Sequence, residues 1–123
     1  MPLAAAEMQQ NDDSEITAYC VVMTTTATDA EAKTLARLLV EQQLAACVQR
    51  QSVNSTYVWE GRICDESETL LLIKTEYSQY EAVAAFIHAH HSYTVPEILC
   101  LPVQAGSTPY LAWVTESLRK KHG

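Results

Sequence analysis

Apolar and polar positions follow two different periods along the chain, and the change of period separates strands from helices. Segments rich in β-branched and apolar residues, as is typical of strands, occur at 16–25, 45–53, 56–59, 63–75 and 97–103. Segments with apolar residues three or four positions apart, as is typical of helices, occur at 29–43, 78–91 and 107–118. The second and third strand-like segments form either a strand pair or one long bent strand. The predicted order is β-α-β-β-α-β with one further helix.

Capping and turn residues support these boundaries. Thr28 and Ser78 are predicted to cap the first two helices. Gly61 supplies the hairpin turn, because glycine takes a positive φ without steric cost. Pro96 ends the second helix, since the residue before a proline avoids helical geometry. Pro102 places the last strand at a sheet edge or at its own end.

The order of elements predicts an α+β protein with a ferredoxin-like βαββαβ fold. That fold is an antiparallel four-stranded sheet with two helices on one face, here extended by a long β-hairpin and an added C-terminal helix. We expect one domain at 16–119, a disordered polar tail at 1–15 and a short C-terminal tail at 120–123.

The second face of the predicted sheet is too apolar to be wetted. Its strands and hairpin carry a run of large apolar residues, namely Tyr57, Val58, Trp59, Leu70, Leu71 and Leu72. Burial against further copies of the chain explains this face, so we predict an obligate homo-oligomer. The alternative is that the C-terminal helix alone covers it.

Composition narrows the class of protein. The chain has 123 residues, 48% of them hydrophobic, with 8 Lys and Arg against 15 Asp and Glu, for a net charge of −7. Such a chain supports one folded core and is not disordered. The excess of acidic residues argues against nucleic-acid binding, because phosphate contacts require clustered Lys and Arg.

Three kinds of sequence feature are absent, and their absence bears on where the protein is located and on whether it is an enzyme. It contains no stretch of about 20 apolar residues, so we expect no membrane partner. The four cysteines are scattered and form no C-x-x-C pair, which favours the reducing cytoplasm. No catalytic motif is present, and we expect the protein not to be an enzyme.

The histidines at the end of the second helix are the one conspicuous polar group. His88 and His91 share a helix face, whereas His90 points nearly opposite to His88. One interpretation is a copper, zinc or nickel site at His90 and His91, completed by a second subunit if the helix unwinds there. The other is that these side chains hydrogen-bond backbone carbonyls.

Aromatic residues near turns form a second candidate group, made up of Tyr57, Trp59, Tyr93 and Tyr110. They either line a small-molecule cleft at a subunit junction or pack with hydrogen-bonded tips. Two basic residues of the hairpin, Arg62 and Lys74, are expected to pair with Glu60, Glu66 or Glu68.

Five separated strings together resemble one family, the CutA divalent-cation tolerance proteins. They occur in register at 44–48, 55–61, 68–75, 90–97 and 106–113. The resemblance implies a ferredoxin-like subunit in a cytoplasmic homotrimer whose long hairpins pair between neighbours. It also implies tolerance of divalent metals and binding of copper(II) or another divalent cation, one per subunit. The trimer resembles that of the PII signalling proteins.

Only part of the family's metal site can be carried over to the residues of this chain. The paired histidines of the family fall on His90 and His91, and a cysteine present in some members aligns with Thr24. Ser92 stands where the family usually has proline, which implies a less rigid loop.

Two function hypotheses follow. The first is a homotrimeric copper-binding protein acting in divalent-cation tolerance. The alternative is a PII-like trimeric signalling module that binds a metabolite or a partner protein in clefts between subunits. The residues expected to line those clefts are Tyr57, Trp59, Glu97 and Tyr110.

Overall fold

The elements follow the predicted order. The computed structural model describes residues 18–119, so the predicted tails at 1–15 and 120–123 lie outside the described residues. The strands are β1 (Tyr19–Thr26), β2 (Cys47–Trp59), β3 (Arg62–Glu76) and β4 (Leu99–Pro102). The helices are α3 (Asp29–Glu41), α4 (Tyr80–His90) and α5 (Thr108–Arg119), with the 3₁₀ turn η1 (Tyr77–Gln79) before α4. Between residues 18 and 119, no helix is long and apolar enough to cross a membrane.

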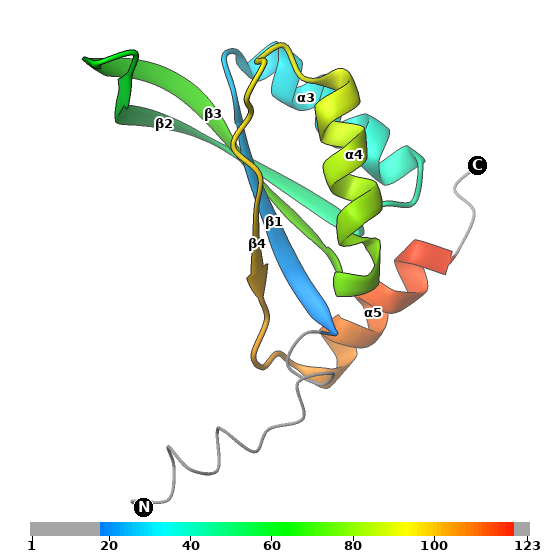
Figure 1. Ribbon diagram of the computed structural model, residues 1–123. Helices are drawn as coiled ribbons and strands as arrows, with labels where there is room; N and C mark the ends of the chain where they lie inside the picture. Colours follow the sequence, from blue (N-terminus) through cyan, green and yellow to red (C-terminus); the bar gives the residue numbers. More distant parts are fainter. Residues whose placement is uncertain (1–17, 120–123) are drawn as a thin grey trace, which may run out of the picture.

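The strands form one antiparallel sheet in the order β2-β3-β1-β4, which confirms the predicted ferredoxin-like arrangement. Helices α3 and α4 lie side by side on one face of this sheet (Figure 1). The hydrophobic core lies between them and the sheet, and its largest buried side chains are Leu39, Leu71, Ile73 and Ile87. Strands β2 and β4 form the two edges.

Local backbone geometry sets both ends of α3. Thr28 is extended, and its hydroxyl accepts a hydrogen bond of 3.1 Å from the backbone N–H of Glu31, which confirms the predicted cap. The helix was expected to continue to Gln43 but ends at Glu41. Gln43 adopts φ 60°, a left-handed conformation that closes the helix two residues earlier.

The start and end of α4 also differ from the prediction. Ser78 does not cap it, because Ser78 lies inside η1 and the Tyr80 N–H bonds the Tyr77 carbonyl within that turn. The helix ends at His90 rather than His91, and His91 is already extended, with φ −94° and ψ 142°. The histidine pair is therefore split between the helix and the loop that follows it.

The hairpin consists of two long strands, since β2 is continuous from Cys47 to Trp59. Glu60 and Gly61 form its two-residue turn with φ values of 50° and 77°. Positive φ at both positions is the geometry that matches the twist of the flanking strands, and the expected role of Gly61 is confirmed. Strand β4 is shorter than the expected 97–103 because residues before Leu99 leave the sheet; it lies at an edge, as Pro102 predicts.

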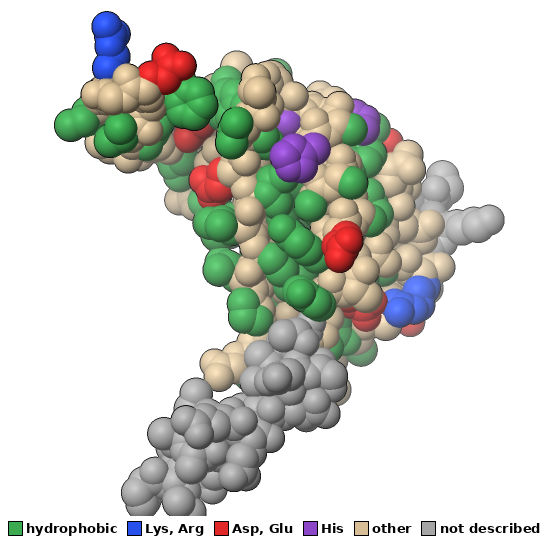
Figure 2. Space-filling view, in the orientation of Figure 1, with side chains coloured by type: hydrophobic (Ala, Val, Ile, Leu, Met, Phe, Trp, Pro, Cys, Tyr) green, Lys and Arg blue, Asp and Glu red, His purple; other side chains and the backbone are tan. Residues whose placement is uncertain are grey.

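The face of the sheet turned away from α3 and α4 is covered at one end only. There α5 is tied to the sheet by Thr115, which bonds the Tyr19 hydroxyl and a Glu76 carboxylate oxygen at 2.7 Å each. Further along this face, Leu99 and Leu101 of β4 remain 52% and 46% exposed. Hydrophobic side chains gather at the hairpin tip and along the edge at β4 (Figure 2). The C-terminal helix alone therefore does not cover the face.

Candidate functional site

A groove of about 740 Å³ opens at the end of the sheet opposite to α5. Three parts of the chain form its walls: the end of β1, the hairpin, and the loop between α4 and β4. The lining residues are Thr25, Ser55, Thr56, Tyr57, Trp59, Glu66, Glu68, Tyr93, Thr94, Val95 and Glu97. No Lys or Arg is among them, so the groove is acidic.

Strand register explains why these side chains meet. Thr25 pairs with Leu70, and Ser55 pairs with Glu66. Alternate residues of a strand share a face, so Glu66 and Glu68 lie on the same face of β3 as Leu70. This face of β3 changes from leucine to glutamate where the strand passes the end of β1, and the change creates the acidic wall of the groove.

Two tyrosines hold these glutamates. The Tyr57 hydroxyl donates to Glu66 Oε1 at 2.5 Å, and the Tyr93 hydroxyl donates to Glu68 Oε2 at 2.8 Å. The hydrogen bond to Glu66 raises the pKa of Tyr57 to about 12. Burial, followed by the hydrogen bond to Glu68, raises the pKa of Tyr93 well above its ordinary range. Both phenols therefore stay protonated donors at neutral pH.

We predict that Glu66→Gln lowers the pKa of Tyr57 from about 12 toward its ordinary value of about 10, because the charged acceptor is removed. Ultraviolet difference titration of the wild type and the variant measures this shift, with Glu81→Gln on α4 as the matched control. A raised pKa means that the stability contributed by the pair is fully present below pH about 10 and is lost as pH rises through the folded-state pKa. An unchanged tyrosine titration in Glu66→Gln would contradict the assigned cause.

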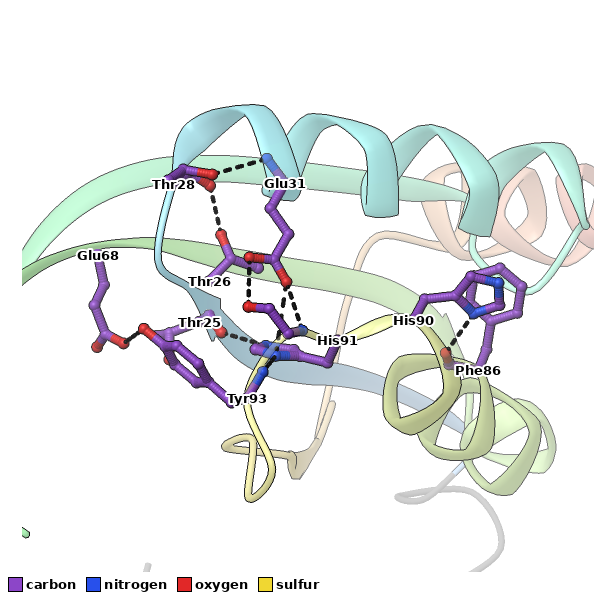
Figure 3. A network of polar contacts seen from close by, with 10 residues as sticks. Thr25, Thr26, Thr28, Glu31, Glu68, Phe86, His90, His91 and Tyr93 are labelled. Carbon is purple, nitrogen blue, oxygen red and sulfur yellow. Dashed lines mark hydrogen bonds and ion pairs between the residues drawn. The ribbon is translucent and has the colours of Figure 1, made fainter.

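His91 connects this groove to the rest of the fold. Its side chain is fully buried; Nε2 donates to the Thr25 carbonyl at 2.6 Å, and Nδ1 accepts from the Tyr93 N–H at 3.0 Å (Figure 3). Glu31 lies 3.8 Å from Nδ1 and accepts hydrogen bonds from the N–H and hydroxyl of Ser92, each at 2.9 Å. Ser92 thus connects the loop after α4 to Glu31 of α3.

The two histidines predicted as metal ligands point in different directions. His90 Nδ1 lies 2.9 Å from the Phe86 carbonyl, and its ring stacks on Phe86, pointing away from His91 (Figure 3). The buried Thr24 hydroxyl has no hydrogen-bond partner in the described part of the chain. In that same part, no three His, Cys, Asp or Glu side chains are grouped so as to hold a metal ion. Within one chain, His90 and His91 therefore do not converge on one metal ion, and the full set of His90, His91 and Thr24 stays a prediction. The alternative prediction was that these histidines hydrogen-bond backbone carbonyls, and the rings of His90 and His91 both do so.

The aromatic candidates divide between two places. Tyr57, Trp59 and Glu97 line the groove together with Tyr93. Tyr110 lies at the other end of the sheet, where its ring packs against Trp113 and Lys74 Nζ lies 5.8 Å from its centroid.

Two groove residues were assigned differently by sequence reasoning. Glu66 and Glu68 were expected to pair with Arg62 or Lys74, but tyrosine hydroxyls are their partners. Their spacing of two residues, directly before the apolar run of β3, was the signal for a shared acidic face.

The chain is similar to one family over most of its length. The family model described as CutA1 divalent ion tolerance protein matches residues 20–117. A CutA protein of Arabidopsis thaliana, named chloroplastic, is 40% identical over 110 residues, which are 88% of this chain but only 60% of that protein. The divalent-cation tolerance protein CutA of Escherichia coli is 38% identical over 110 residues, covering 89% of this chain and 98% of that protein.

A solved structure has the same fold. It is described as the periplasmic divalent cation tolerance protein CutA from Archaeoglobus fulgidus, and it superposes with a TM-score of 0.81 at 32% identity. The superposition covers 82% of this chain and 99% of that one. The resemblance seen in the five sequence strings is thereby confirmed, and the chain belongs to the CutA1 divalent ion tolerance protein family.

Proposed function

We propose that this chain acts as a non-enzymatic homotrimer in tolerance of divalent cations. The family match over residues 20–117 carries this proposal. Assembly is supported by the half-exposed Leu99 and Leu101 on the sheet face and by the exposed Val58 and Ile63 at the hairpin tip. The free cysteines of the described chain favour a cytoplasmic location.

Growth under metal stress tests the role. The chain is expressed in an Escherichia coli strain lacking its own CutA, and growth is measured over a range of copper(II) concentrations. We expect tolerance to be restored by the wild type. Unchanged sensitivity despite soluble, folded protein would contradict the proposal.

Copper(II) is the cation that we propose, one per chain, with His90 as the ligand from this chain and the remaining ligands supplied by a second copy of it. The His90 ring is exposed and engages a carbonyl through Nδ1, which leaves Nε2 for a metal, and neutral imidazole suits copper(II). Titration with copper(II) is compared between wild type, His90→Ala and the control His88→Ala, an exposed histidine of the same helix. Equal affinity in all three would remove His90 from the site.

A second candidate function is favoured by the groove. Tyr57, Trp59 and Glu97, expected at a ligand-binding cleft, line one concave surface. We propose that this surface binds a small molecule. Tyr110 would contribute to it only from a second copy of the chain, because within one chain its ring lies beside Lys74, toward the other end of β3.

A further inference from the structure

Two of the four free cysteines lie next to each other on neighbouring strands. Cys100 of β4 is paired with Val22 of β1, and Cys20 stands two residues before Val22. Alternate residues of a strand share a face, so both thiols lie on the same face of the sheet. Burial, followed by a hydrogen bond with the Cys100 side chain, raises the pKa of Cys20 to about 12. The two sulfurs are therefore within hydrogen-bonding reach of each other.

The thiol pair lies on the side of the sheet that carries α3 and α4. Cys20 is 1% exposed and belongs to the hydrophobic core, and Cys100 packs against that core. Leu99 and Leu101 flank Cys100 and point to the opposite face, which we expect further copies of the chain to bury. The pair is therefore complete within one chain. Cys100 is only partly buried and belongs to an edge strand, so an ion reaches the pair from its side.

The diagonal spacing of the two thiols favours a bridging ion over a disulfide. Diagonal neighbours on paired strands have Cα atoms about 7–8 Å apart, which is beyond the range that a disulfide joins without backbone movement. A metal–thiolate bond is about 2.3 Å long, so a linear sulfur–metal–sulfur unit separates its two sulfurs by roughly 4.6 Å. Cys20 and Cys100 therefore suit an ion held between the sulfurs better than a bond that joins them.

The number and type of ligands identify the class of ion. A structural zinc site takes four ligands, but between residues 18 and 119 no three His, Cys, Asp or Glu side chains are grouped to hold a metal. The buried core residues around Cys20 carry no side-chain oxygen or nitrogen. Two thiolates in apolar surroundings suit a soft monovalent ion, and copper(I) is the ion of this kind that thiolates select.

We propose that Cys20 and Cys100 form a two-coordinate copper(I) site between β1 and β4. Each sulfur loses its proton to solvent and forms one bond to the ion, and no electron is transferred. Because the thiol protons must be displaced, binding strengthens as pH rises. This site is separate from the copper(II) ligand proposed at His90, which is the last residue of α4 and offers imidazole instead of sulfur.

Competition with bicinchoninate, a coloured copper(I) chelator, tests the proposal. The full chain is reduced, kept free of oxygen and titrated with copper(I) in the presence of the chelator. We expect one tightly held copper(I) per chain, with thiolate-to-copper absorption in the ultraviolet and release of two protons per ion. Failure of the wild type to take copper(I) from the chelator would overturn the proposal.

Cysteine variants locate the site. Cys100→Ala removes a partly buried thiol at the sheet edge and is expected to weaken copper(I) binding at least about a hundredfold, more than the loss of an outer-shell partner costs. Cys20→Ala is expected to do the same, with its fold checked by circular dichroism. The matched control, Cys47→Ser with Cys64→Ser, leaves the proposed pair intact and is expected to bind like the wild type. Wild-type affinity in folded Cys100→Ala or Cys20→Ala, or loss of binding in the control, would overturn the assignment.

The readouts keep this inference separate from the proposed role. His90→Ala is expected to keep its copper(I) affinity, and Cys100→Ala is expected to keep its copper(II) affinity. Absence of copper(I) binding in a chain that restores copper tolerance would overturn the thiolate site alone. Copper(I) binding at the cysteine pair by a chain that fails to restore tolerance would overturn the proposed role alone.

Discussion

His91→Ala is expected to lower the free energy of unfolding by about 2–4 kcal/mol, measured by urea denaturation. The side chain is fully buried and bonds the Thr25 carbonyl through Nε2 and the Tyr93 N–H through Nδ1. Its removal leaves both backbone groups without a partner and opens a cavity between β1 and the groove loop. The same change should loosen the loop that holds Tyr93 against Glu68.

His90→Ala is the matched control for this prediction. His90 is exposed, makes one hydrogen bond to a carbonyl of its own helix and stacks on Phe86. We expect its loss to lower the free energy of unfolding by less than about 1 kcal/mol. Equal effects of the two substitutions would show that the buried network around His91 contributes little to stability.

Leu99→Asp combined with Leu101→Asp is expected to abolish assembly. Both side chains are about half exposed on the sheet face that α5 does not cover. If further copies bury this face, two carboxylates there would be desolvated without partners, at a cost that a shared interface does not tolerate. Mass in solution should fall from that of the proposed trimer, three times 13.7 kDa, to that of one chain, 13.7 kDa.

The control for this prediction adds the same charge elsewhere. Ala82→Asp with Ala85→Asp places two carboxylates on exposed positions of α4, on the other side of the sheet. We expect this variant to keep the wild-type mass. If the β4 variant also keeps that mass while remaining folded, the exposed leucines do not form the interface.

Local signals predicted the fold well where backbone chemistry acts over a few residues. The Thr28 cap and the turn at Gly61 were correct because each depends on one side chain or one φ angle. The predicted boundaries of α3 and α4 were wrong for a similarly local reason. Gln43 took a left-handed conformation and Ser78 entered a 3₁₀ turn, and neither residue type signals these choices.

The candidate site was less predictable, because its contacts join residues far apart in the chain. Helical spacing placed His88 and His91 on one face, but His91 lies beyond the helix and reaches the end of β1 instead. The pairing of Tyr93 with Glu68 depends on where the loop after α4 crosses the hairpin. No periodicity in the sequence encodes that crossing.

The sequence by itself determined the order of elements, the hairpin turn and the family, because the first two follow from local periodicity and turn residues and the family follows from contiguous strings. It did not determine which strand residues face away from the helices, since Leu71, predicted on the open face, is fully buried in the core. Only the tertiary structure decided that the histidine pair is divided between Phe86 and Thr25 and that acidic and aromatic side chains meet in one groove. The physical reason is strand register together with the path of the loop after α4. These bring Glu66, Glu68 and Tyr93 together across the sheet, and they are set by packing of the whole domain.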